Sequence, residues 1–411
     1  FFMHSRVGLN TAYLSKEWFD AVKACVDEAE KLDMQAWLYD EDRWPSGAAG
    51  GIVTKNPKHR MRTLRVEVLD KPAKLKWTPE TLAVFTGRVD KHVVRQVKRL
   101  AKGGRPRSLG KGESILRCHV QLDDCRDWYN GYTYLDTMSH EAVREFIKVT
   151  HEAYHKNLGQ HFGKRVPGIF TDEPNYGDTL GLPWGKCKLE VPWTPKLLEV
   201  FRRRYGYDLV PHLLEIFYDV DGVEITPARW QYHDCTTHLF VDAFNRQIGE
   251  WCAKHNMQYT GHMLAEETLS SQTAVVGSTL RSYEHMQAPG MDILTEHNRQ
   301  YDTAKGVSSV ARQFGRKWRL TETYGCTGWD FPFVGHKAVG DWQAALGINL
   351  RCQHLSWYTM EGEAKRDYPA GIFYQSPWWE SYSKVEDYFA RIHAVMTRGA
   401  EVRDLLVIHP V

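Results

Sequence analysis

The chain has 411 residues and a nearly balanced charge, with 53 Lys and Arg against 51 Asp and Glu and a formal net charge of +2. A net charge this small excludes a global field that would draw the chain to nucleic acid or to an anionic membrane. The sequence has no apolar stretch near the ~20 residues needed to cross a bilayer. Its length suits one barrel of about 250 residues with insertions.

The chain is rich in aromatic residues, with 15 Trp and 20 Tyr. Sugar rings stack on flat aromatic faces, although most of these side chains are expected in the core and at its rim. The cysteines include no CxxC pair, which argues against a zinc knuckle and a dense disulfide framework and favours a reducing, cytoplasmic compartment. They stand at positions 25, 118, 125, 187, 235, 252, 326 and 352.

Residues 1–51 predict the first two strands of a barrel. Phe1–Met3 fits the end of a first strand, and the missing initiator Met indicates a chain cut from a longer protein. Ser15–Leu32 predicts a helix that begins at Ser15, because its apolar residues recur at helical spacing. Met34–Tyr39 predicts a second strand, which ends in the acidic cluster 40–42.

Residues 52–130 predict a β-rich insertion after the second strand. Alternating runs separated by Pro and Gly fit antiparallel strands at Leu64–Leu69, Leu82–Val89 and Ile115–Leu122. Residues 91–112 hold eight Lys and Arg and no acid, but they lack interleaved aromatic residues. This composition favours a solvated hairpin and loop over a nucleic-acid surface.

Residues 131–400 predict the remainder of the barrel. A third strand is expected at Tyr132–Met138 and a helix at His140–Phe162, before a fourth strand that ends on Glu173. Residues 184–230 predict a helical excursion. The later strands are predicted at Met257–Leu264, Gly290–Leu294, Arg319–Glu322 and Ile348–Leu355. This alternation of strands and helices is typical of an α/β fold, a (β/α)8 TIM-type barrel, and residues 401–411 predict the first strand of a further domain.

Two strand-end glutamates are the candidate catalytic residues. GIFTDEP carries Glu173 at the end of the predicted fourth strand, and WRLTE carries Glu322 at the end of the seventh, across the barrel mouth. Paired carboxylates cleave glycosidic bonds, one as general acid and the other as base or nucleophile. Glu173 is the candidate acid because Pro174 and aromatic neighbours surround it, and Glu322 is the candidate base or nucleophile. The alternative is that one or both are structural ion-pair partners.

Further polar residues near predicted strand ends outline a pocket for sugar hydroxyls. The acidic cluster 40–42 beside Trp44 suits either hydroxyl groups or a hard cation such as Ca²⁺, and the alternative is an acidic loop that caps a helix. No organic cofactor is expected, because Ser46–Gly51 has neither the GxGxxG nor the Walker spacing. The substrate-binding candidates are His4, Asp40, Glu41, Asp42, Trp44, Asp172, His262, Glu284, His285, Asp292, Tyr324, His354 and Tyr358.

An HExxH motif at His151–His155 raises the alternative of a zinc peptidase. His161 follows near the position of a third ligand, but Gly159 is displaced by one residue from the metzincin pattern. On a helical wheel Glu152 points away from the apolar stripe, and the helix lies outside the predicted barrel. The motif therefore remains a remote alternative.

Five segments resemble the catalytic region of glycoside hydrolase family 106, the α-L-rhamnosidases and their relatives, in matching order over nearly the whole chain. They are FFMHSRVGLNTAYLSKEWFD, AWLYDEDRWPSGAAGG, GIFTDEP, LTETYG and YFARIHAVMTRG followed by LLVIHP. The resemblance implies a (β/α)8 barrel, exo-cleavage of α-L-rhamnosides with inversion, calcium at the sugar hydroxyls and accessory β domains beyond residue 411. It also implies that Glu173 is the acid and Glu322 the base that activates water.

The leading hypothesis is therefore an exo-acting α-L-rhamnosidase for rhamnose-bearing plant polysaccharides or glycosides. One alternative is a retaining glycosidase of other specificity, for which the carboxyl groups would lie ~5–5.5 Å apart instead of the ~6.5–9.5 Å of an inverting enzyme. Another is a barrel that binds carbohydrate without cleaving it. An oligosaccharide or glycoside is the expected partner in each case.

Overall fold

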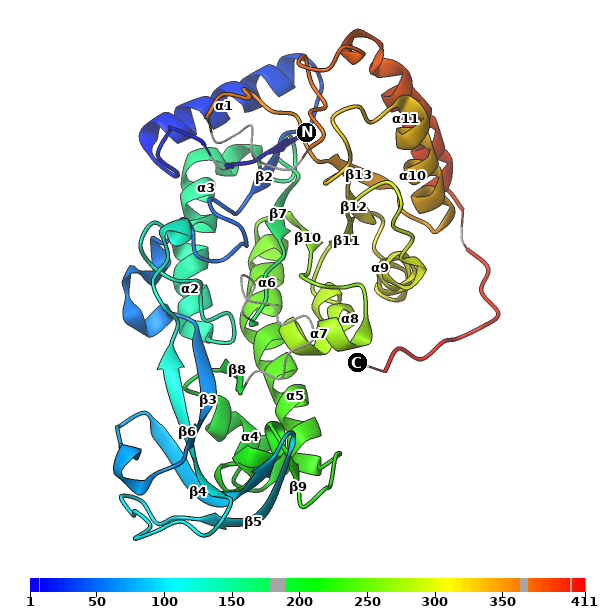
Figure 1. Ribbon diagram of the computed structural model, residues 1–411. Coiled ribbons are helices and arrows are strands. Elements are labelled where there is room, and N and C mark those ends of the chain that lie inside the picture. The colour runs from blue at the N-terminus through cyan, green and yellow to red at the C-terminus, as the bar shows by residue number, and fades with distance from the viewer. Residues whose placement is uncertain (7, 178–188, 363–368, 400, 411) are drawn as a thin grey trace.

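The computed structural model describes residues 1–6, 8–177, 189–362, 369–399 and 401–410; Cys187 lies outside them. Seven strands form one parallel sheet in the spatial order β1-β2-β7-β10-β11-β12-β13 (Figure 1). Their bounds are β1 Phe2–Met3, β2 Trp37–Tyr39, β7 Gly168–Asp172, β10 Gln258–His262, β11 Ala288–Ile293, β12 Leu320–Thr323 and β13 Leu350–Gln353. The sheet follows chain order, as β/α units require.

The parallel sheet curls into a nearly closed barrel. Side chains from its two edge strands meet side chains from its middle strands in one apolar cluster, which fills the barrel interior. The members of this cluster are Phe2, Tyr39, Phe170, Leu320, Leu350 and Cys352. The barrel-type α/β fold expected from the sequence is therefore present, with seven parallel strands.

Helices pack around the outside of the barrel (Figure 1). α1 shows why they form: Ser15 accepts a hydrogen bond from the Trp18 N–H as N-cap, and Phe19, Val22 and Val26 are buried on one face. The bounds are α1 Lys16–Lys31, α2 His140–Val149, α3 His151–Leu158, α4 Leu197–Tyr205, α5 Pro227–Phe240, α6 Gln247–Lys254, α7 Leu269–Val275, α8 Thr279–Tyr283, α9 Tyr301–Gln313, α10 Phe333–Ala345 and α11 Ser383–Met396. None of the described helices is both long and apolar enough to cross a bilayer.

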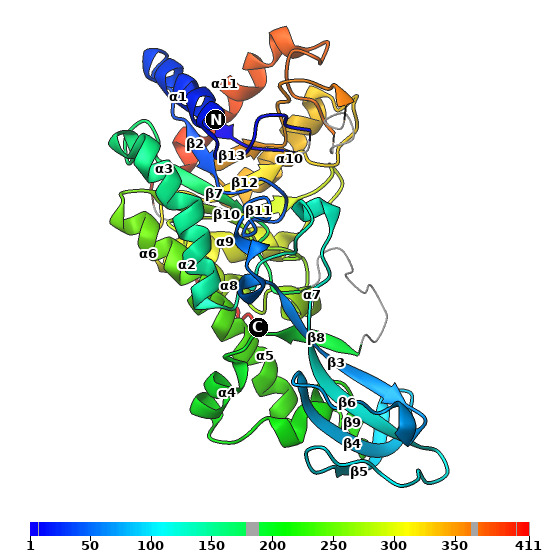
Figure 2. The same cartoon turned by 90° about the vertical axis from the view of Figure 1, so that its left-hand side faces the viewer.

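A second, antiparallel sheet projects from one side of the barrel (Figure 2). Its order is β8-β3-β6-β4-β5-β9, and all but the β5–β9 pair are antiparallel. The bounds are β3 Arg62–Leu69, β4 Thr81–Asp90, β5 Val93–Arg99, β6 Glu113–Leu122, β8 Glu190–Trp193 and β9 Asp219–Val220. Because β3 follows the loop after β2, and β8 follows the segment after β7, both connections leave the barrel at the carboxyl ends of its strands.

The strand predicted at Tyr132–Met138 does not form, and β2 pairs directly with β7. Tyr132 and Leu135 make only isolated bridges, to Arg126 and Arg60. The backbone of this buried segment bonds to the preceding loop instead, with Met61 N–H donating to the Tyr134 carbonyl at 3.1 Å. Glu173 therefore follows the third strand of the sheet, and Glu322 lies in the sixth.

The predicted helical excursion at 184–230 is mixed in the part that the structure describes, 189–230. It contains α4 and a 3₁₀ segment at Val210–Ile216, but also β8 and β9, which pair with opposite edges of the antiparallel sheet. β8 forms because the exposed edge of β3 offers backbone partners, with Arg62 aligned to Trp193. Tertiary pairing therefore overrides the helical pattern here.

Candidate active site

Adjacent strands bring four polar side chains to the barrel mouth as two aligned pairs. Asp172 at the end of β7 aligns with His262 at the end of β10, and Asp292 on β11 aligns with Glu322 on β12. Residues aligned in register on neighbouring strands project from the same face of a sheet. The carboxyl ends of four strands thus form one polar site.

Glu173 and Glu322 lie on either side of the His262 imidazole. A Glu173 carboxylate oxygen is 3.7 Å from Nε2, and a Glu322 carboxylate oxygen is 4.0 Å from Nδ1. The two sequence-predicted carboxylates therefore meet in one site, each against a different nitrogen of the His262 imidazole. Glu173 has a left-handed backbone conformation, with φ of +48°, so the chain turns sharply there.

Trp44 holds the Glu173 carboxylate from the loop after β2, the strand that pairs with β7. Its indole N–H donates to a Glu173 oxygen at 2.6 Å, and its own carbonyl accepts the Trp128 indole N–H at 2.6 Å. Trp44 follows the acidic cluster after β2, so this contact joins two strand-end loops. The indole fixes the orientation of Glu173.

Tyr39, which the sequence did not single out, is the hydroxyl at the centre of the site. Its O–H lies 3.0 Å from an Asp172 oxygen and 3.4 Å from a Glu322 oxygen. Its ring is stacked between His4 and Phe170, with centroid separations of 3.5 and 4.4 Å. The signal was available, because Tyr39 is the last residue of a strand that ends at the mouth.

Burial and mutual repulsion raise the pKa of the site carboxyls. Burial, followed by the negative charge of Asp172, raises the pKa of Glu322 to about 8. Burial likewise raises the pKa of Glu173, and burial with the charge of Glu322 raises the pKa of Asp292 well above its ordinary range. Protons therefore remain on these carboxyls at pH values where an exposed carboxyl has lost its own.

His262 is the cation among these carboxylates. Burial opposes its charged form, but the neighbouring Glu173, Asp172 and Glu322 outweigh that effect and raise its pKa well above the ordinary value. Neither imidazole nitrogen makes a hydrogen bond within the part of the chain that the structure describes. His262 thus stabilises the carboxylates through its charge.

The three acids of the cluster 40–42 point in different directions. Glu41 faces the site, where it contacts His4 Nε2 at 2.8 Å. Asp42 accepts a hydrogen bond from the Ser5 hydroxyl at 2.7 Å. Asp40 is fully buried behind the site, where it accepts from the Thr171 hydroxyl at 2.8 Å, so it does not reach the mouth.

Two groups of side chains could hold a metal ion. His4, Glu41 and Asp172 each offer one ligand atom within 4.8 Å of the others, and Asp172, Glu173 and His262 form a second such group. One Glu41 oxygen is buried without a hydrogen-bond partner, and burial raises the pKa of Glu41 well above its ordinary value. Arg6 lies 3.9 Å from Asp172 and is the nearby permanent cation.

Asp292 is held by a second residue that the sequence did not single out. Glu266, just beyond β10, accepts the backbone N–H of Asp292 at 2.7 Å and the hydroxyl of Tyr283. One Asp292 carboxylate oxygen is buried without a partner among the described residues. Asp292 therefore keeps an acceptor available beside Glu322. Glu266 follows the strand end by four residues, so its position could not be read from strand ends alone.

A cavity of about 1140 Å³ opens beside Glu322. His354 lies at its inner end, with Nε2 3.7 Å from a Glu322 oxygen, and both residues line the cavity. Tyr358 lines the same cavity from the loop after β13 and is 91% exposed. Arg6 and His4 line the opposite wall, so the cavity offers polar groups on two sides of Glu322.

Three predicted residues do not join the site. Tyr324 follows Glu322 closely, but its ring packs into a separate apolar cluster and its hydroxyl donates to the His336 carbonyl at 3.1 Å. The left-handed backbone at Tyr324, with φ of +77°, turns the side chain away from the mouth. Glu284 and His285 precede β11, so they lie at the opposite end of the barrel.

The HExxH segment does not form a metal site. His151 is fully buried against Asp40, 3.7 Å away, and burial lowers its pKa to about 3. Glu152 accepts the indole N–H of Trp251 at 2.6 Å. Among the described residues, no candidate metal group includes His151, Glu152 or His155.

Comparisons with known proteins agree with this arrangement. The family model described as alpha-L-rhamnosidase, of glycoside hydrolase family 106, matches residues 130–409. A curated relative from Formosa agariphila, named "Putative beta-glucuronidase", is 23% identical over 244 residues, which are 56% of this chain and 20% of the relative. The solved rhamnosidase from Novosphingobium sp. PP1Y superposes with a TM-score of 0.66 at 14% identity, over 97% of this chain and 56% of that one.

The last likeness, at 14% identity, shows a shared fold. The chain spans about half of the solved rhamnosidase and a fifth of the curated relative. The family match, in contrast, covers well over half of this chain and includes both strand-end glutamates. The protein therefore belongs to glycoside hydrolase family 106, the α-L-rhamnosidase family.

Proposed function

We propose that the chain carries the catalytic site of an exo-acting α-L-rhamnosidase, which removes terminal L-rhamnose from plant polysaccharides or glycosides with inversion. The observation that carries this proposal is the meeting of Glu173 and Glu322 on either side of His262. Membership of the α-L-rhamnosidase family supports L-rhamnose as the sugar that is released.

Glu173 is the proposed general acid. Burial raises the pKa of Glu173, which keeps its proton available for transfer. The Trp44 indole N–H fixes one of its oxygens. In the reaction, the Glu173 proton passes to the glycosidic oxygen as the bond from that oxygen to the anomeric carbon breaks, and the aglycone leaves as an alcohol.

Glu322 is the proposed base. It takes a proton from a water molecule while the water oxygen bonds to the anomeric carbon from the face opposite the leaving group. The cavity beside Glu322 provides room on that side. A retaining enzyme needs a carboxyl separation of ~5–5.5 Å and an inverting enzyme one of ~6.5–9.5 Å. Each carboxylate contacts a different nitrogen of the His262 imidazole, and this arrangement supports the wider separation of an inverting enzyme.

The remaining polar groups of the mouth are proposed to bind the sugar. Asp292 keeps a buried oxygen without a partner, which suits a sugar hydroxyl as donor. His354 and Tyr358 line the cavity beside Glu322. Trp44 offers a partly exposed indole at the rim, on which the apolar face of a deoxysugar can pack.

Calcium fits part of this site. The two carboxylates of the group His4, Glu41 and Asp172 supply oxygen ligands, and the partnerless Glu41 oxygen suits a cation. Water and sugar hydroxyls would complete the six to eight oxygens that calcium takes. Bound calcium would supply positive charge that orients the sugar hydroxyls.

A glucuronide is the second candidate substrate, because the curated relative is named for one. The mouth, however, holds Glu41, Asp172, Glu173, Asp292 and Glu322 close together. A uronate carboxylate at the cleaved sugar would meet repulsion from these groups. A neutral deoxysugar therefore fits the site better.

Hydrolysis of aryl glycosides tests the proposal. The chain should release the phenol from an aryl α-L-rhamnoside faster than from the corresponding β-glucuronide, α-L-arabinoside or galactoside. Proton NMR of the first turnover should show β-L-rhamnose as the initial product, because inversion changes the anomer. Turnover of another sugar alone would reject rhamnose, and α-L-rhamnose as first product would reject inversion.

A further inference from the structure

One hairpin of the antiparallel sheet, with the loop that follows it, is strongly basic on both of its faces. The eight Lys and Arg of residues 91–112 lie in the β4–β5 turn, on β5 and in the loop that follows it. All eight are exposed, as is Arg88 on β4. We call these nine residues the basic hairpin. They are Arg88, Lys91, Arg95, Lys98, Arg99, Lys102, Arg105, Arg107 and Lys111.

These charges are largely uncompensated. None of the nine forms an ion pair with another part of the chain that the structure describes. Arg88 stands directly opposite Arg95 in the β4–β5 register, and like charges at opposed positions destabilise a sheet. The nearby acids are Glu113 opposite Arg88, Asp90 at the end of β4, and Asp221, which accepts the Gln96 N–H at 3.2 Å. An anion bound here would relieve this repulsion.

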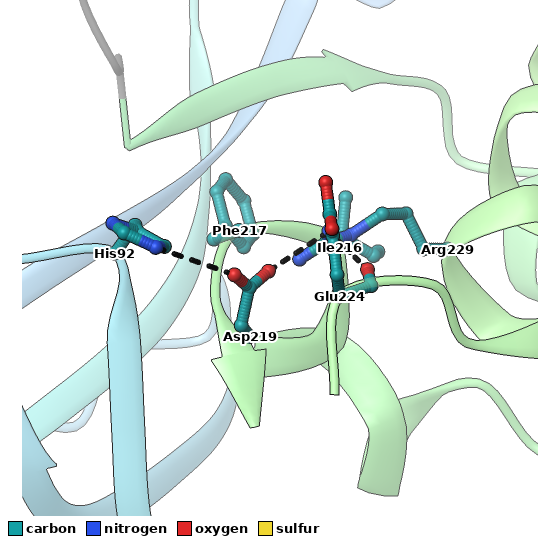
Figure 3. A pocket seen from close by; sticks show the side chains of 6 residues that line it. All are labelled: His92, Ile216, Phe217, Asp219, Glu224 and Arg229. Carbon is teal, nitrogen blue, oxygen red and sulfur yellow. Dashed lines mark hydrogen bonds and ion pairs between the residues drawn. The ribbon is translucent and has the colours of Figure 1, made fainter. Parts of the chain in front are cut away.

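The hairpin is anchored to β9 and α5 by a joint at its β4–β5 turn (Figure 3). Asp219 of β9 lies 3.5 Å from His92 and 3.1 Å from Arg229. Arg229 also donates to the carbonyls of Glu215 and Tyr218, both at 2.7 Å. Arg229 is thus committed to the joint, which lines a cavity of about 460 Å³.

Charge is segregated between this surface and the rest of the chain. Outside residues 91–112 the chain carries 45 Lys and Arg against 51 Asp and Glu, a net charge of −6. The barrel mouth gathers Glu41, Asp172, Glu173, Asp292 and Glu322. Since the antiparallel sheet joins the barrel through the loops after β2 and β7, the basic hairpin belongs to an extension of the mouth.

We propose that the basic hairpin binds the acidic main chain of a polysaccharide whose neutral terminal sugar is cleaved at the barrel mouth. This inference rests on the proposed glycosidase function and names the class of its substrate. Arg and Lys recognise carboxylate and sulfate groups through charge-assisted hydrogen bonds. An exposed ion pair contributes little alone, so a polymer with repeated charges is required to engage several cations at once.

Single-stranded nucleic acid also carries repeated charge, but it is bound by aromatic side chains that stack on its bases. Residues 91–112 contain no Trp, Tyr or Phe. A polyanion without bases therefore fits this surface better.

The test compares two triple variants of the whole chain. Lys98→Gln, Lys102→Gln and Lys111→Gln together remove three charges from the basic hairpin. Lys156→Gln, Lys164→Gln and Lys254→Gln remove three exposed charges near the opposite end of the barrel, as the matched control. Binding of polygalacturonate, dextran sulfate, neutral dextran and single-stranded DNA is measured by calorimetry at two salt concentrations.

The unmodified chain and the control should bind polygalacturonate or dextran sulfate, should not bind neutral dextran, and should bind more weakly at high salt. The hairpin variant should lose about tenfold in affinity, since three exposed pairs are removed. Equal affinity of the two variants, equal binding of neutral dextran, or tighter binding of DNA would overturn the proposal. Turnover of the aryl rhamnoside should be the same in all three proteins, and its absence from all three would reject the glycosidase function instead.

Discussion

Trp44 shows how a single hydrogen bond sets the properties of the proposed acid. Its indole N–H lies 2.6 Å from Glu173 and stabilises the ionised carboxylate, so it lowers the pKa of Glu173 against the effect of burial. In Trp44→Phe that stabilisation is lost and the pKa of Glu173 rises. The basic limb of the kcat/KM profile, where Glu173 loses its proton, should therefore move to higher pH. An unchanged limb in the variant would contradict this role.

Asp172 should control the other limb of the profile. Burial and then the charge of Asp172 raise the pKa of Glu322 to about 8, so ionised Glu322 becomes available as pH rises towards that value. In Asp172→Asn the repulsion is removed and the pKa of Glu322 falls. The acidic limb of the kcat/KM profile should move to lower pH, even if the maximum value of kcat/KM also changes. A limb that moves to higher pH would show that another group sets it.

Tyr39 should matter through its hydroxyl rather than its ring. Tyr39→Phe keeps the stacking between His4 and Phe170 and removes the donor shared by Asp172 and Glu322. Loss of a hydrogen bond that orients Asp172 and Glu322, worth about 1.5–3 kcal/mol to a charged group, should lower kcat by about tenfold or more. The unsatisfied buried carboxylates should also lower the melting temperature by a few degrees. Tyr154→Phe, which removes a buried hydroxyl bonded to the Tyr39 carbonyl, is the matched control and should keep its activity. Equal activity of both variants would show that the Tyr39 hydroxyl has no role in turnover.

At the scale of elements, the site depends on the close approach of β7 and β10. Gly261 on β10 has φ of +117°, and a Cβ there would lie 1.9 Å from the Thr171 carbonyl oxygen. Only glycine permits this approach, which aligns Asp172 with His262. Gly261 is therefore required by the packing of β7 against β10 and takes no part in the reaction itself.

Gly261→Ala should separate the two strands and destabilise the barrel by about 3 kcal/mol or more, with a lower melting temperature and lost activity. Gly131→Ala is the control, because φ there is also left-handed, +82°, but nothing lies within 4 Å of the added Cβ. This control should cost about 1–2 kcal/mol from backbone strain alone. A Gly261→Ala protein as stable as the control would show that β10 can shift without loss.

The placement of functional residues at the carboxyl ends of barrel strands explains how much of the site could be predicted from sequence. Apolar β-prone runs predicted a strand that ends on Glu173 and a strand at Arg319–Glu322, which the structure shows as β7 and β12, and carboxylates at their ends were predicted to meet. The run at Tyr132–Met138 has the same local character, yet it bonds to the loop near Met61. Hydrophobic periodicity predicts which residues are buried, but it does not predict which segment the backbone N–H and C=O groups bond to.

At the scale of the whole molecule, the site combines residues from segments far apart in the chain. His4, Glu41, Asp172, His262 and Glu322 come from five different strand ends. Sequence reasoning found these residues because each follows or ends a strand. It expected Glu284 and His285 at the mouth, but these two residues precede β11 and lie at the other end of the barrel. It missed Glu266 because the loop after β10 brings that residue back to the Asp292 N–H.

The charge pattern is also a property of the whole chain. The net charge of +2 is the sum of a basic hairpin and an otherwise acidic chain. The sequence already shows the basic run at 91–112, and the fold adds that this run lies in the antiparallel sheet, apart from the barrel. The three-dimensional distribution therefore carries information about the substrate that the total does not.

The central claim is that Glu173 and Glu322 act together as acid and base, and turnover of an aryl α-L-rhamnoside by Glu173→Gln and Glu322→Gln tests it most directly. Each variant should keep its fold, as judged by circular dichroism and melting temperature, and lose about 10²- to 10⁴-fold in kcat. Glu173→Gln should recover much of the loss with a dinitrophenyl leaving group, which departs without a proton, whereas Glu322→Gln should not. Wild-type turnover by either folded variant would contradict the account.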